Sequence, residues 1–126
     1  MPEFIPDKIV PRELDSFVRA YLHAAEWTDC GQDADADLQA AAWSPDAIAR
    51  AIEACSDFRE MAGPLLDETG AGNERNGTDF WLTRNHHGAG FWDRGYGEIG
   101  DQLTDLAKTF SGVDTYVGDD GLAYFS

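Results

Sequence analysis

The sequence predicts one α+β domain over residues 1–126, with the element order α-α-β-β-α-β-β and helices packed on a small antiparallel sheet. Three observations lead to this fold class. Apolar residues recur at helical spacing in three segments, two other segments have the alternation and turns of β-hairpins, and glycine-rich or acidic connections separate them. A chain of this length can bury one ordinary hydrophobic core.

The first part of the chain is predicted as a lead-in, a helix and a loop. Residues 1–10 contain Pro2 and Pro6 and are expected to be extended. Pro11 suits the first turn of a helix because its φ angle is already fixed near the helical value. Apolar residues then recur at helical spacing, and the helix is expected to end near Glu26 or Trp27. An acidic loop over residues 28–43 follows.

The second helix has clear signals at both ends. Ser44 is the expected N-cap, and Pro45 follows it at the first helical position. Gly63 and Pro64 are expected to break the helix, because proline lacks an amide donor and clashes with the preceding turn. A flexible, polar loop over residues 69–77 comes next.

Residues 79–93 are predicted as a β-hairpin. The run from Phe80 to Thr83 alternates in side-chain direction as a strand does, a turn follows, and Phe91 with Trp92 supplies the return strand. The aromatic residues of both strands are expected to pack in the core. Replacement of Trp92 by alanine is therefore expected to unfold or strongly destabilise the protein.

The last part of the chain is predicted as a helix followed by a second hairpin. Ile99, Leu103 and Phe110 lie on one face of a helix over residues 96–110. Residues 113–125 then contain two short alternating segments around an Asp-Gly turn, which is a strong hairpin signal.

The composition is dominated by negative charge. The chain has 24 acidic and 9 basic residues, which gives a formal net charge of −15. Such a surface repels nucleic acid and anionic lipid, so direct binding to either is not expected. The expected partners are cations or proteins with basic grooves; the alternative is that the acidity serves solubility alone. No secretory signal or membrane-spanning run is present, which predicts a cytoplasmic protein in which Cys30 and Cys55 stay reduced.

An alternation of aspartates in the acidic loop requires comparison with calcium-binding loops. Asp33, Asp35 and Asp37 have the spacing with which an EF-hand loop begins. An EF-hand also needs glycine at its sixth position and glutamate at its twelfth, and here these are Leu38 and Ser44. A solvated acidic loop is therefore expected, and no metal is assigned.

The segment around residue 86 offers an enzyme alternative. His86, His87 and Asp93 could serve a small metal-assisted hydrolase, but adjacent histidines on a strand point to opposite faces and do not chelate one metal together. Arg84 and Arg94 flank the same segment. They are expected to pair with carboxylates such as those of Asp79 or Asp93, or to cover a tryptophan face.

Two motifs between residues 79 and 121 are distinctive. They are Asp79-Phe-Trp-Leu-Thr-Arg-Asn with His87-Gly-Ala-Gly-Phe-Trp-Asp-Arg-Gly95, and Tyr116-Val-Gly-Asp-Asp-Gly121. Together they resemble a family of small acidic proteins from bacteriophages and plasmids. The resemblance covers residues 79–121, and the N-terminal helices match only in acidic helical character. It implies a context and no catalytic residues: short acidic phage proteins are often inhibitors that imitate nucleic acid and occupy the basic groove of a host defence protein.

The sequence as a whole favours a binding protein over an enzyme, with no catalytic residue and no cofactor. The expected partner is a host protein with a basic nucleic-acid-binding groove, and a scaffold protein without mimicry is the further alternative. Glu53, Asp57 and Glu60 share one helix face, as a row of carboxylates imitating phosphates requires. The expected partner-binding residues are Asp29, Asp33, Asp35, Asp37, Asp46, Glu53, Asp57 and Glu60.

Overall fold

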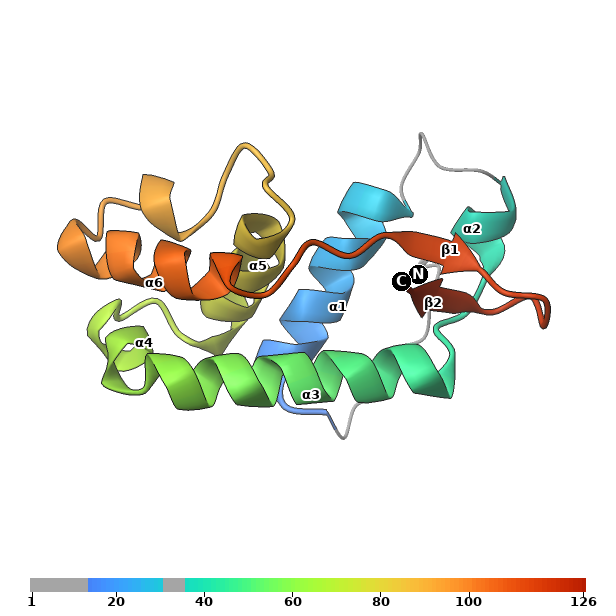
Figure 1. Ribbon diagram of the computed structural model, residues 1–126, viewed down its shortest axis with the longest axis horizontal. Helices are drawn as coiled ribbons and strands as arrows, with labels where there is room; N and C mark the ends of the chain where they lie inside the picture. Colours follow the sequence, from blue (N-terminus) through green and yellow to red (C-terminus); the bar gives the residue numbers. More distant parts are fainter. Residues whose placement is uncertain (1–13, 31–35) are drawn as a thin grey trace, which may run out of the picture.

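Helices form most of the structure, and a two-stranded antiparallel sheet lies at one end (Figure 1). This computed structural model describes residues 14–30 and 36–126. The elements are α1 (Ser16–Asp29), α2 (Ala36–Ala40), α3 (Pro45–Ala62), α4 (Pro64–Glu68), α5 (Asn73–Arg84), the 3₁₀ helix η1 (Phe91–Asp93), α6 (Glu98–Lys108), β1 (Thr115–Val117) and β2 (Ala123–Phe125). The predicted α+β class is confirmed, but the predicted order is wrong in the middle of the chain.

The first helix begins with a side-chain cap. The Asp15 carboxylate accepts hydrogen bonds from the backbone amides of Phe17 and Val18, at 2.8 and 3.3 Å. These amides have no partner within the helix, so the cap stabilises the first turn. The predicted start at Pro11 and the predicted lead-in over 1–10 lie outside the described residues.

The acidic loop predicted over residues 28–43 is only partly a loop. Helix α1 continues to Asp29, and the short helix α2 occupies part of the segment. Trp43 then forms a parallel bridge with Ala123 of β2 and is buried, with its ring centroid 4.9 Å from that of Phe125. The end of the segment is thus fixed by apolar burial.

Helix α3 forms as predicted. The Ser44 hydroxyl accepts a hydrogen bond from the Ala47 amide at 2.9 Å, and Pro45 is the first helical residue. Gly63 ends the helix with a φ of 51°, a value that glycine adopts without a steric penalty. Pro64 then starts α4, so the predicted break is confirmed.

The hairpin predicted over residues 79–93 is wrong. Residues 73–84 form helix α5, and a turn connects it to η1. Helix α5 packs against α1, α6 and η1, and every residue from Asp79 to Arg84 is buried. A helix covered on several sides has no long polar face, so its sequence lacks the periodicity by which an amphipathic helix is recognised.

Gly77 shows why the predicted loop over 69–77 is also wrong in its second half. The residue lies inside α5, where glycine is intrinsically unfavourable by about 1 kcal/mol relative to alanine. A Cβ atom at this position would lie 2.2 Å from the backbone oxygen of Phe17. The glycine therefore permits the close approach of α1 and α5 and does not make a turn.

Aromatic rings from several elements fill the core. Phe58 of α3 and Phe80 of α5 stack almost in parallel, with centroids 4.1 Å apart and planes 5° apart. Tyr21 of α1 lies 5.3 Å from Phe80 and contacts Trp81 edge to face at 5.2 Å. The Trp81 indole N–H donates to the Thr28 hydroxyl at 2.8 Å, which satisfies the polar atom of this fully buried residue.

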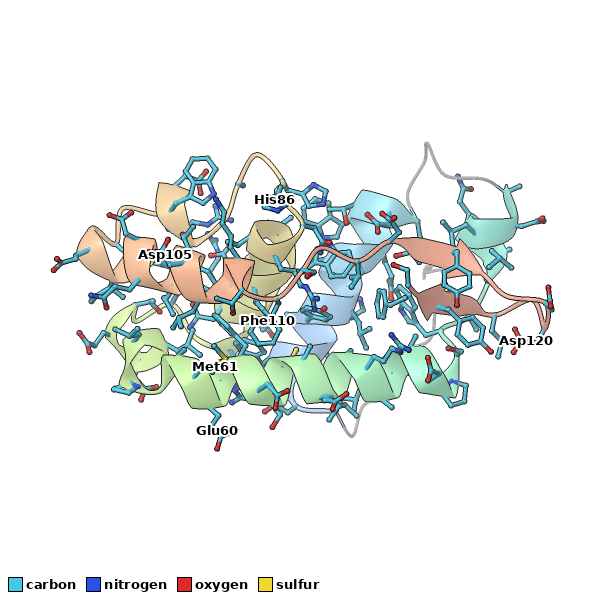
Figure 2. The ribbon with its side chains drawn as sticks, viewed as in Figure 1. Glu60, Met61, His86, Asp105, Phe110 and Asp120 are labelled. Atoms are coloured by element: carbon cyan, nitrogen blue, oxygen red, sulfur yellow. The ribbon has the colours of Figure 1, made fainter. Side chains whose placement is uncertain are left out.

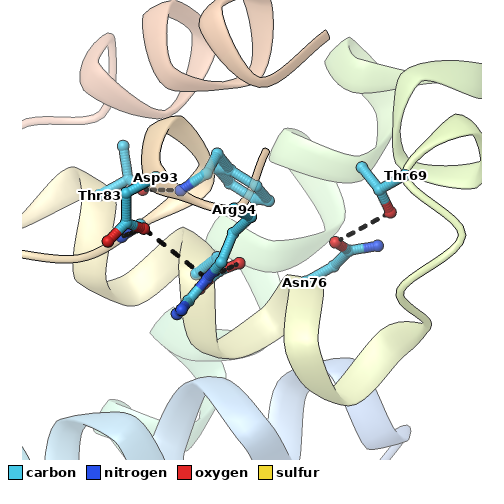
Figure 3. A network of polar contacts seen from close by, with 8 residues as sticks. Thr69, Asn76, Thr83, Asp93 and Arg94 are labelled. Atoms are coloured by element: carbon cyan, nitrogen blue, oxygen red, sulfur yellow. Dashed lines mark hydrogen bonds and ion pairs between the residues drawn. The ribbon is translucent and has the colours of Figure 1, made fainter. Parts of the chain in front are cut away.

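A polar network holds the segment after α5 against that helix (Figure 3). Arg94 donates to both carboxylate oxygens of the fully buried Asp79, with a shortest distance of 2.7 Å, so the predicted pairing of Arg94 with a carboxylate is confirmed. Burial raises the pKa of Asp79, and the Arg94 guanidinium opposes this shift. The Thr83 hydroxyl also accepts a hydrogen bond from the Phe91 amide at 3.2 Å, which fixes the start of η1.

The C-terminal elements agree with the prediction. Helix α6 buries Leu103 and Ala107, and β1 and β2 form the predicted second hairpin, with Tyr116 opposite Tyr124. Their rings stack at 5.6 Å on one face of the hairpin, while Phe125 points into the core. No described helix has both the length and the apolar character needed to cross a membrane.

The two tryptophans of the segment predicted as a hairpin are expected to differ sharply in their contribution to the free energy of unfolding. Trp81 is fully buried, whereas Trp92 is 49% exposed, so the predicted core position of Trp92 is wrong. Trp81→Ala should lower the free energy of unfolding by about 3–5 kcal/mol, and Trp92→Ala by less than about 1 kcal/mol. Urea denaturation of both variants checks this, and equal losses would contradict the structure.

Gly77→Ala separates helix propensity from packing. Propensity alone predicts a stabilisation of about 1 kcal/mol. Because the added methyl group would overlap the Phe17 backbone, we expect instead a destabilisation of about 1–3 kcal/mol. Thermal unfolding followed by circular dichroism measures the sign, and a higher melting temperature would show that α1 and α5 are not in close contact at this point.

Candidate functional site

Helix α3 has 18 residues and one face buried along its whole length. The inward residues Ala47, Ala51, Cys55, Phe58 and Ala62 are all buried. Burial also raises the pKa of the Cys55 thiol, which keeps it protonated and unreactive. The capped ends and the buried face fix the position of the backbone, and with it the positions from which the outward side chains project.

A solvent-exposed flank of the same helix carries four carboxylates, which we call the acidic stripe. It consists of Asp46, Glu53, Asp57 and Glu60. With Arg50 included, successive positions are three or four residues apart, so they lie in one row. The row extends over about 21 Å at a rise of 1.5 Å per residue. Figure 2 shows Glu60 pointing away from the body of the protein.

The basic residues of α3 neutralise the acidic stripe only in part. Arg50 lies within the row and pairs with Asp46 at 3.1 Å, which leaves the row with a net charge of −3; both side chains are more than half exposed, so the pair contributes little stability. Arg59 is directed toward α1, where it pairs with Asp15 at 2.8 Å and covers the Phe17 ring. The carboxylates of Glu53, Asp57 and Glu60 form no ion pair with any described residue.

Of the other four predicted binding residues the structure describes two, Asp29 and Asp37, and neither extends the acidic stripe. Asp29 is half-buried and accepts a hydrogen bond from the Thr115 hydroxyl at 2.9 Å, which ties α1 to β1. Asp37 is exposed on α2, which also lies beside β1, whereas α3 packs against β2. Asp33 and Asp35 fall outside the described residues. The structure thus groups the four α3 residues and places Asp29 and Asp37 on the other side of the hairpin.

The histidines proposed for the hydrolase alternative form a helix C-cap. The His86 amide donates to the Thr83 carbonyl at 3.2 Å, and the His87 amide donates to the Leu82 carbonyl at 3.0 Å. This is the Schellman arrangement, in which the residue after the cap has a positive φ. His86 has a φ of 59°, and in the part of the chain that the structure describes no three His, Cys, Asp or Glu side chains are grouped to hold a metal ion.

The buried position of Arg84 was not predicted from the sequence. Its side chain is buried at the end of α5, where it donates to the Ser111 carbonyl at 3.0 Å and to the Tyr21 hydroxyl at 3.1 Å. Within the described residues it forms no ion pair, so its predicted pairing with a carboxylate is wrong. The sequence offered one signal for this position, which is that Arg84 ends a mostly apolar run that begins at Phe80.

His86→Gly is expected to raise stability. A side chain in the left-handed region costs about 1–2 kcal/mol, and part of this gain is offset by the greater freedom of glycine in the unfolded chain. We therefore expect a gain of about 0.5–1 kcal/mol in the free energy of unfolding, measured in urea. His87→Gly, at a position without a positive φ, is the matched control and should not be stabilising. A loss of stability in His86→Gly would contradict the assigned cap.

The chain matches no protein family model, no curated protein sequence and no solved structure. A function for the chain is therefore inferred from the residues described above.

Proposed function

We propose that this protein is an acidic binding protein that inhibits a host nucleic-acid-binding protein by imitating nucleic acid. The acidic stripe is the observation that carries the proposal. Its carboxylates project from a helix whose inner face is packed in the core, so the backbone that carries them is already ordered before binding. Such preorganisation reduces the entropy lost when a partner binds.

Charge spacing indicates how much of a nucleic-acid strand the acidic stripe can imitate. One strand of duplex DNA carries a charge about every 3.4 Å along its axis. Four carboxylates over about 21 Å give one charge about every 7 Å, which is roughly half that density. The stripe therefore needs neighbouring acids to resemble a strand.

Acids at both ends of α3 can supply the additional charge. Asp67 and Glu68 are exposed on α4, which follows α3 after a single glycine. Asp119 and Asp120 are exposed in the turn of the β1–β2 hairpin. Figure 2 shows Asp120 beyond the N-terminal end of α3. A partner with a long basic groove could contact the acidic stripe together with one of these ends.

The resemblance of residues 79–121 to small phage and plasmid proteins is the reason for proposing a host defence protein, such as a nuclease, as the target. The net charge of −15 also favours fast encounter with a strongly basic surface. Function in the cytoplasm of the host cell is part of the same proposal.

Trp92 supports a second candidate, a protein that binds through an aromatic anchor and without mimicry. Its side chain is 49% exposed on η1, and tryptophan is among the residues that contribute most to protein interfaces. Trp81 cannot serve in this way because it is fully buried. Binding through Trp92 would depend little on salt, which distinguishes the two candidates.

Capture from a bacterial lysate at low and at high salt tests the proposal. We expect a nucleic-acid-binding protein to be retained at low salt, released at high salt, and displaced by added duplex DNA. Changing the acidic stripe by Asp46→Asn, Glu53→Gln, Asp57→Asn and Glu60→Gln should weaken binding about tenfold or more.

A variant with the same total charge provides the control. Glu74→Gln, Glu98→Gln, Asp101→Asn and Asp105→Asn also remove four exposed carboxylates, all of them on α5 or α6. This control should bind within about twofold of the unmodified protein if the acidic stripe is the contact surface. Equal weakening of both variants would show that net charge alone attracts the partner. Binding that ignores salt but is lost in Trp92→Ala would support the aromatic anchor instead.

A further inference from the structure

A cavity of about 240 Å³ lies between α3, the end of α5, the segment after α6 and strand β2. Its wall combines charged groups of both signs with apolar side chains. Arg84 and Arg50 supply guanidinium groups, Glu53 and Asp57 supply carboxylates, and Phe110 and Phe125 supply aromatic rings. Figure 2 shows Phe110 between the end of α6 and helix α3. The cavity is smaller than the pockets of roughly 300–1,000 Å³ that hold drug-sized ligands, so it suits a small metabolite.

Arg84 is a buried cation in this cavity that lacks an ion-pair partner among the described residues. Its side chain is only 8% exposed, and its guanidinium has five N–H donors. Three of its donor contacts are accounted for: two N–H groups donate to the Ser111 carbonyl and one to the Tyr21 hydroxyl. The Phe80 and Phe110 rings flank it at 5.9 and 5.6 Å. Two donors remain, and no described carboxylate neutralises the charge, although buried charges are normally paired.

The remaining charges restrict the kind of ligand. Glu53 and Asp57 would repel a phosphate or a dicarboxylate, and the two arginines would repel a simple cation. Arg50 already pairs with Asp46, but an uncharged apolar molecule would leave Arg84, Glu53 and Asp57 without an ion-pair partner. A zwitterion satisfies both signs at once, and the two phenylalanine rings provide a surface for an apolar substituent.

We propose that this cavity binds a free α-amino acid with an apolar side chain. The carboxylate contacts Arg84, the ammonium group contacts Glu53 and Asp57, and the side chain packs against Phe110 and Phe125. A carboxylate on a guanidinium forms the strong, two-pronged hydrogen bonds for which arginine is suited. This inference goes beyond the proposed function and does not rest on it, since it concerns the isolated protein.

Calorimetry with the purified protein and three related probes tests the proposal. The probes are L-leucine, 4-methylvalerate, which lacks the amino group, and isoamylamine, which lacks the carboxylate. We expect leucine to bind at least tenfold more tightly than either single-charge analogue. Valine and methionine extend the test to other apolar side chains. If none of the three amino acids binds more tightly than the analogues, the proposal is wrong and the cavity holds only water.

Paired substitutions of acidic residues locate the binding site. Glu53→Gln with Asp57→Asn removes the two carboxylates that line the cavity. This pair should weaken the binding of leucine at least tenfold and should not weaken the binding of 4-methylvalerate. Glu60→Gln with Asp67→Asn removes the same charge from exposed residues outside the cavity lining and should leave both affinities unchanged. Equal effects of the two pairs on leucine would place the site elsewhere.

Arg84→Lys tests the carboxylate contact. The change keeps the positive charge but removes the planar pair of donors, so both leucine and 4-methylvalerate should bind less tightly. Circular dichroism establishes that the variant is folded. Unchanged affinity in the folded variant would overturn the assigned role of Arg84; if the variant does not fold, the paired α3 substitutions decide the question.

Discussion

The stack of Phe58 on Phe80 is the contact on which the rest of the structure depends. It joins the long helix α3 to the enclosed helix α5, and Phe17 and Tyr21 of α1 pack against the same Phe80 ring. Phe110, which follows α6, meets both stacked rings edge to face. Three helices and the end of a fourth are therefore held by a few mutually contacting rings. The orientation of the acidic stripe follows from this arrangement, because the stack fixes the rotation of α3 about its own axis.

Much of the fold could be predicted from the sequence where an element has one buried and one exposed face. Helix α3 has a serine cap, a proline start and a Gly63-Pro64 stop, and α6 has a clear apolar face, so both were predicted. The β1–β2 hairpin was predicted from its Asp-Gly turn. Helix α5 was not predicted, because burial on several sides removes the polar positions that would reveal its helical period. The error at Trp92 has the same origin, since its predicted burial depended on the predicted hairpin.

The acidic stripe and the cavity also differ in how far each could be predicted from the sequence. The acidic stripe could be predicted because neighbours on a helix face are set by local spacing alone. The cavity could not, since Arg84, Glu53 and Phe125 come from separate parts of the chain and meet only through tertiary packing. The structure also separates acids that are near in sequence: Asp29 and Asp37 lie beside β1, and α3 lies beside β2. Sequence proximity therefore grouped described acids that the structure separates, and it gave no sign of the cavity.

The position of Phe125 has a consequence for how the protein folds during synthesis. Its ring contacts those of Tyr21, Trp43 and Trp81, so strand β2 completes a core to which α1, the segment before α3 and α5 have already contributed. Until residue 125 has left the ribosome, these three rings lack one of their neighbours and Trp43 lacks its β-bridge partner. Contacts between residues so distant in the sequence form slowly because a long loop must close first. The nascent chain thus exposes two tryptophans and a tyrosine from its core until its last strand is in place.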